Sequence, residues 1–87
     1  MNAAHIQKAE ILKALGHPIR YCIVEGLVNG AQNVGAMTHC TGVPQPTVSQ
    51  HLNILKSAGV LSCERAGNEM RYSVSNALAK KIVSVLG

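Results

Sequence analysis

Three cysteines are the side chains of this 87-residue chain best suited to covalent or metal chemistry: Cys22, Cys40 and Cys63. Thiolates attack disulfides and oxidants and bind soft metals. The nearest histidines in sequence are His17 and His39. An odd number of cysteines without a Cys-x-x-Cys pair does not suit a disulfide framework. The sequence therefore predicts free thiols, whose chemistry depends on what the fold brings together.

Three interpretations of these cysteines stay open. They are small buried core side chains, because Cys22 and Cys40 occupy apolar helix faces and Cys63 shares the inward side of its expected strand with Leu61. Alternatively, two or three sulfurs converge within the fold or across a dimer, where they form a disulfide or a polysulfide with reactive sulfur species, or bind arsenite. A disulfide requires Cα atoms within about 7 Å. Thirdly, His39 and Cys40 bind a metal with a partner, although two adjacent ligands are few.

A second group of side chains is suited to hydrogen bonding rather than to reaction. It consists of polar residues in one short stretch: Gln45, Thr47, Ser49, Gln50 and His51. Glutamine can bind an adenine edge through two hydrogen bonds, and serine and threonine bind bases or phosphates. Residues 45–56 contain no carboxylate that would repel DNA. The plainer alternative is a solvated helix face, with His51 bonded to the backbone of a neighbouring helix.

Two arginines further along the chain, Arg65 and Arg71, are candidates for phosphate contacts, which would stabilise binding without reading a base sequence. They flank the turn of an expected hairpin. Its strands are Val60 to Arg65 and Met70 to Val74, and residues 66–69 contain the Gly-Asn pair typical of hairpin turns. Alternatively, both arginines are solvated charges of the hairpin that contact no phosphate.

Apolar residues at helical spacing predict five helices around this hairpin. Their expected extents are Asn2 to Leu15, residues 18–28 closed by Asn29-Gly30, Asn33 to Thr41, Thr47 to Ala58, and a last helix capped by Ser75 and running to Leu86. The third and fourth helices meet across Gly42-Val43-Pro44, as in a helix-turn-helix. We predict a mainly α fold in one domain, residues 1–87, with four helices, a β-hairpin and a C-terminal helix.

Composition limits the class of partner. Apolar residues make up 47% of the chain and charged residues 14%, so apolar surface is expected to face a partner, most simply a second copy. The net charge of +4 suits a polyanion. Aromatic residues, at 2%, are too few for stacking on single strands. No apolar run reaches a membrane span, and charged residues interrupt the N-terminus, so a cytoplasmic protein is expected.

Three separated stretches resemble the ArsR/SmtB family of winged helix-turn-helix repressors. They are LKALGHPIR at 12–20, GVPQPTVSQHL at 42–52 with Leu55-Lys56 and Gly59-Val60-Leu61, and Arg65, Gly67 and Arg71-Tyr72 in the expected wing. The resemblance implies a homodimer joined through the first and last helices, which binds double-stranded operator DNA and leaves it when an inducer binds. The family often has serine where this chain has Pro44, which removes a side-chain cap.

Metal-sensing members of that family use a Cys-x-Cys near the third helix, or Asp and His on the last helix. The corresponding positions here hold Asn33 and Gly35, and residues 75–86 contain no His, Asp, Glu or Cys. The resemblance therefore implies neither a metal nor a cofactor, and leaves a thiophilic or redox inducer acting on Cys22, Cys40 and Cys63 as the candidate signal.

Of three other functions, two would require different features of the sequence. The sequence does not distinguish a DNA-binding regulator without sensing from an inducible one. A protein-interaction module on the same fold would have an acidic or apolar face at residues 45–56, which is not found. An enzyme is disfavoured, because the chain has no phosphate loop, His-Glu-x-x-His or nucleophile elbow.

Overall fold

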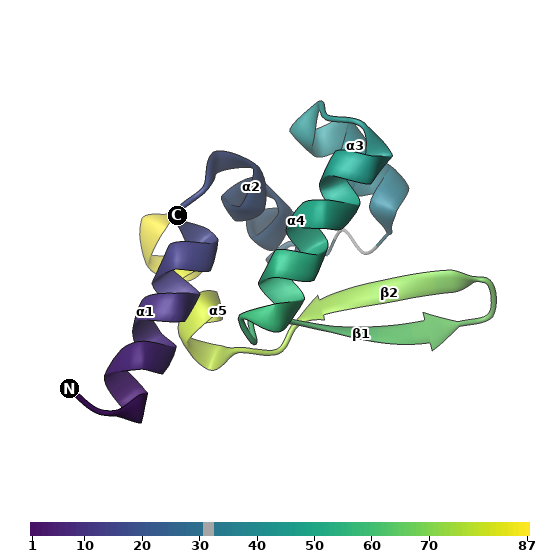
Figure 1. The fold of residues 1–87 in the computed structure, drawn as a ribbon. Coiled ribbons are helices and arrows are strands. Elements are labelled where there is room, and N and C mark those ends of the chain that lie inside the picture. The colour runs from purple at the N-terminus through teal and green to yellow at the C-terminus, as the bar shows by residue number, and fades with distance from the viewer. Residues whose placement is uncertain (31–32) are drawn as a thin grey trace.

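The computed structural model describes residues 1–30 and 33–87. Within them the chain forms five helices and one antiparallel hairpin (Figure 1). In order these are α1 (Ala3–Leu15), α2 (Pro18–Val28), α3 (Val34–Thr41), α4 (Gln45–Ser57), β1 (Leu61–Ala66), β2 (Glu69–Val74) and α5 (Ala77–Leu86). This confirms the mainly α fold, with a hairpin between the fourth and last helices. None of the described helices is both long and apolar enough to cross a membrane.

Polar side chains cap the first turns of four helices, α1, α2, α3 and α5. The Asn2 side chain accepts hydrogen bonds from the backbone N–H groups of Ala4 and His5, and satisfies donors that the helix itself leaves free. The last helix starts later than expected: its cap is Asn76, which accepts a bond from Ala79 N at 2.9 Å, so the expected Ser75 cap is wrong.

The fourth helix begins two residues before the expected Thr47. Pro44 occupies the N-cap position and Pro46 lies in the first turn, where a proline loses no intrahelical hydrogen bond. The carbonyl of Pro44 accepts from the N–H groups of Thr47 and Val48. Pro44 provides no side-chain cap, because the proline ring has no hydrogen-bond acceptor.

The core lies where α2 and α4 meet the base of the hairpin and α5. Its fully buried side chains come from the three helices and the loop before β1: Val24, Val48, Leu55, Val60 and Ala79. Helix α4 places Val48, Leu52 and Leu55 on one side, which fixes the opposite side toward solvent. Packing therefore sets which residues of α4 a partner can reach.

The hairpin is anchored at one end only. Leu61 pairs with Val74 and both are buried, whereas the rest of each strand is exposed or half-buried. The strands run as far as Ala66 and Glu69, so the turn has two residues rather than the expected four. Gly67 takes the first turn position with φ +64°, where glycine avoids the clash of a Cβ. In Figure 1 the hairpin projects away from the helices.

Candidate functional site

A tight turn between α3 and α4 sets the direction of α4. Gly42 ends α3 in the left-handed conformation, with φ +72°. The hydroxyl of Thr41 donates to the carbonyl of Met37 at 2.8 Å and accepts from Val43 N at 3.4 Å. Met37 itself is buried in the core. The turn is thus fixed on both sides, and α4 leaves it in a defined orientation.

The solvent side of α4 carries most of the polar residues predicted as a contact surface. Gln50 is two positions from both Val48 and Leu52, about 200° around the helix from each, so it faces directly away from the core. Gln45 and Gln50 are exposed, and Thr47 and Ser49 are half-buried on the flanks. In the part of the chain that the structure describes, none of these four side chains hydrogen-bonds elsewhere in the protein.

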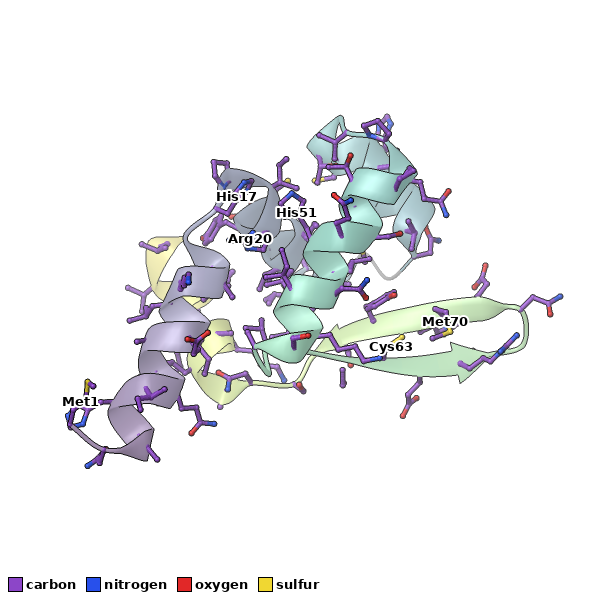
Figure 2. All side chains as sticks on the ribbon, viewed as in Figure 1. Met1, His17, Arg20, His51, Cys63 and Met70 are labelled. Carbon is purple, nitrogen blue, oxygen red and sulfur yellow. The ribbon has the colours of Figure 1, made fainter. Side chains whose placement is uncertain are left out.

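His51 lies apart from that face, against α2. Arg20 donates from Nη1 to the Nδ1 of His51 at 3.3 Å, and the rings of His17 and His51 lie 4.6 Å apart between centroids. Figure 2 shows these three side chains gathered between α2 and α4. Partial burial, followed by the charges of His17 and Arg20, lowers the pKa of His51 below its ordinary value. A neutral His51 accepts the arginine hydrogen bond.

Arg20 is the functional residue that sequence reasoning missed. Its Nε donates to the carbonyl of Ala14 at 2.7 Å, and Nη2 lies 3.5 Å from the carbonyl of Lys13, so one guanidinium joins the end of α1 to His51 of α4. Carbonyls in the last turn of a helix lack intrahelical donors. Two signals were available: Arg20 lies two residues after the helix-starting Pro18, and it ends the stretch 12–20 that carries the family resemblance.

The hairpin separates the two candidate arginines. Arg71 pairs with Glu64 across the strands, and Arg65 pairs with Met70. Since successive side chains point to opposite faces of a strand, Arg65 and Arg71 start from opposite faces of the hairpin. Arg65 also donates from Nε to the carbonyl of Gly67 at 3.4 Å. The structure therefore does not bring these two cations together.

The cysteines are not three core residues. Cys22 and Cys63 are half-buried and Cys40 is exposed, so the prediction that all three are buried is wrong. The spacing of apolar residues shows which side of a helix is buried, but not which residues lie at the edge of that side. Cys22 and Cys40 lie at such edges. Cys22 Sγ and Cys40 Sγ lie 3.1 Å apart. A hydrogen bond with Cys40, then burial, raises the pKa of Cys22 to about 11.

Cys63 is separate from this pair. It stands opposite Tyr72 in the hairpin, where burial of the tyrosine and then the Cys63 thiol raise the pKa of Tyr72.

In residues 1–30 and 33–87, no group of three His, Cys, Asp or Glu side chains is arranged to hold a metal ion. Asn33 acts as the N-cap of α3, with its side-chain oxygen accepting from Ala36 N at 2.8 Å.

Residues 15–64 match a family model described as a helix-turn-helix domain. The chain is 36% identical to the biofilm growth-associated repressor of Xylella fastidiosa over 78 residues, which cover 90% of this chain and 68% of that protein. It is 45% identical to the HTH-type transcriptional repressor SmtB of Mycobacterium tuberculosis over 67 residues, 77% of this chain and only half the length of SmtB.

Solved structures give the same picture. The transcriptional repressor BigR of Xylella fastidiosa aligns with a TM-score of 0.82 and 33% identity, covering 99% of this chain and 93% of that one. A homodimeric winged helix-turn-helix domain from Mycobacterium bovis, described as a possible ArsR-family regulator, aligns with a TM-score of 0.86 and 28% identity. That alignment covers 97% of this chain and 78% of the other.

Proposed function

The chain belongs to the ArsR/SmtB family of winged helix-turn-helix transcriptional repressors, and from this premise we propose that it binds double-stranded operator DNA as a homodimer. In this assignment α4 enters the major groove as the recognition helix and the β1–β2 hairpin is the wing. The observation that carries the proposal is the solvent side of α4, which is free of carboxylates, polar apart from the exposed Ile54, and fixed by the turn before it.

The chemistry of that side suits base edges. Gln45 and Gln50 are exposed, and each has the carbonyl oxygen and the NH2 group of its amide available. Thr47 and Ser49 supply hydroxyls at the flanks. Asn53, one turn after Ser49 and Gln50, is exposed on the same side and extends the set. Neither α3 nor α4 contains an acidic residue. The net charge of +4, with Arg65 and Arg71 on the wing, favours approach to phosphates.

Uncovered apolar side chains support the homodimer. On α1, Ile6 and Leu12 are 53% and 55% exposed, and on α5, Val85 and Leu86 are 84% and 68% exposed. A second copy that covers these two helices would remove their apolar surface from water. Two-fold symmetry would then set the recognition helices about 34 Å apart, to match two half-sites on one face of the duplex.

We further propose that a thiol-directed inducer releases the repressor from DNA. The sulfur contact between Cys22 and Cys40 supports this over a purely structural role, and Cys63 lies outside that contact. A DNA-binding regulator without sensing is the alternative if thiol reagents leave binding unchanged. The relatives are repressors rather than enzymes, and we assign no catalytic activity.

Fluorescence anisotropy on duplex DNA from upstream of the protein's own gene tests the function directly. We expect binding at least a thousandfold tighter than to an unrelated duplex of equal length, and affinity that falls steeply with salt. Sedimentation velocity of the free protein should show a dimer. Equal affinity for both duplexes would contradict a sequence-specific repressor, and no binding to either would favour the interaction module.

A further inference from the structure

Two thiols from different helices are in contact at the α2–α3 interface. Cys22 Sγ of α2 lies 3.1 Å from Cys40 Sγ of α3, and 3.8 Å from the carbonyl oxygen of Cys40. A disulfide has an S–S length of about 2.05 Å, so the sulfurs need to approach by roughly 1 Å. This pair therefore needs only a small movement to bond.

The two thiols differ in access, and the pKa of the less accessible one is raised. Cys40 is exposed, so a dissolved oxidant can reach its sulfur, whereas Cys22 is half-buried. The hydrogen bond with Cys40 raises the pKa of Cys22 to about 11, with smaller contributions from burial and from the charges of Cys40 and Glu25. Cys22 is therefore the less readily deprotonated and the less accessible sulfur. Because a dissolved oxidant reaches Cys40 first, Cys40 is favoured as the attacking sulfur and Cys22 as the resolving one.

We propose that Cys22 and Cys40 form a reversible disulfide, which links α2 to α3 and weakens operator binding. The inference deepens the proposed function and rests on it. It names the pair that senses the signal and the chemical class of that signal, a low-molecular-weight disulfide. Metal binding is disfavoured as the use of these thiols, because the described residues provide no third ligand beside them.

The reaction balances as thiol–disulfide exchange. The Cys40 thiolate attacks one sulfur of the small disulfide, and forms a mixed disulfide as the first small thiolate leaves and takes up a proton. The charge and hydrogen bond that raised the pKa of Cys22 are then gone. Cys22 loses its proton, attacks the sulfur of Cys40 and expels the second small thiolate. Two protein thiols are oxidised, and one small disulfide is reduced to two thiols.

The position of Cys40 connects this chemistry to DNA. Cys40 lies in the last turn of α3, two residues before Gly42, where the turn into α4 begins. Drawing its sulfur toward α2 displaces the end of α3, on which the orientation of α4 depends. A recognition helix needs closely defined placement for its base contacts, so we expect a loss of affinity of about tenfold or more.

A Cys63→Ser variant keeps only the two sulfurs of interest and serves as the parent protein. After treatment with oxidised glutathione and denaturation, we expect its mass to fall by two hydrogens, with one cross-linked peptide containing Cys22 and Cys40. The disulfide closes a loop of moderate length, so the melting temperature should rise by on the order of 10 °C. Reduction should restore both mass and DNA affinity.

Two matched variants in the same background complete the test. With Cys22→Ser, Cys40 should retain a glutathione adduct; with Cys40→Ser, neither an adduct nor a disulfide should accumulate. A lasting adduct on the parent, or disulfide-linked dimers, would overturn the pairing. A disulfide that leaves operator affinity unchanged would overturn its regulatory role. If the reduced parent fails to bind any operator, the proposed DNA-binding function fails, while the mass measurement still decides the pairing.

Discussion

The Arg20 guanidinium of α2 donates a hydrogen bond to the imidazole of His51 in α4 over 3.3 Å. The same guanidinium is held by the carbonyl of Ala14 at the end of α1. Three helices are therefore joined by one side chain at the flank of the proposed recognition helix. His51 belongs to this junction, so we expect it to orient α4 rather than read a base.

Lower pH should destabilise the protein through His51. Its folded pKa lies below the ordinary 6.5, because burial and the nearby His17 and Arg20 disfavour the charged ring. The unfolded chain then takes up a proton first as pH falls, so the stability from neutral His51 is complete above pH 6.5 and is lost through the folded pKa. Urea unfolding at several pH values, compared with His51→Gln, measures this. An identical pH dependence in the two proteins would refute the assignment.

Removing the arginine should weaken the fold itself. We expect Arg20→Ala to lower the free energy of unfolding by about 1–3 kcal/mol, since it breaks charged hydrogen bonds to Ala14 and His51. Arg71→Ala is the control, because it removes an exposed cation that has no hydrogen bond to the described residues. Equal stability of the two variants in urea would mean that the junction contributes nothing.

Gln50→Ala should relax sequence preference. Gln50 faces directly away from the core of α4, and a bidentate contact to a base accounts for about 1–3 kcal/mol of discrimination. Anisotropy titrations on the operator and on single-base variants should show weaker specific binding and reduced discrimination at one position. If the ranking of the variants is unchanged, Gln50 reads no base.

The two wing arginines should differ in their contributions. Loss of one phosphate contact weakens binding alike on all duplexes, and lowers the slope of log affinity against log salt by about one unit. We expect that change for Arg71→Ala. Arg65 starts from the opposite face of the hairpin and is held at the turn, so Arg65→Ala should alter the slope by a different amount. Identical slopes for the two variants would contradict this.

A charge on α5 should separate the proposed dimer. Val85 is 84% exposed, and its replacement in Val85→Glu would place a carboxylate in the apolar contact. We expect a monomer by sedimentation velocity and a loss of operator affinity. Ser84→Glu adds the same charge at the neighbouring exposed position, on a different side of the helix, and should remain dimeric. A dimeric Val85→Glu protein would move the interface elsewhere.

The order of elements could be predicted because apolar periodicity and turn residues are local properties of the chain. The start of α4 at Gln45 was missed because proline is compatible with both a loop and a first helical turn. The contacts of Cys22 with Cys40 and of Arg20 with His51 join residues 18 and 31 positions apart. Spacing along one helix cannot reveal such pairs, because they depend on how separate helices pack.

Asn33 places a constraint on how this repressor could evolve. It occupies a position where the resemblance to metal-sensing relatives implies a cysteine ligand, yet here its amide oxygen caps α3. One side chain cannot both cap a helix and coordinate a metal. A lineage that exchanged Asn33 for cysteine would begin with a third helix weakened by about 1 kcal/mol, before any metal was bound to compensate. The cap thus stands between metal sensing and the thiol sensing proposed above.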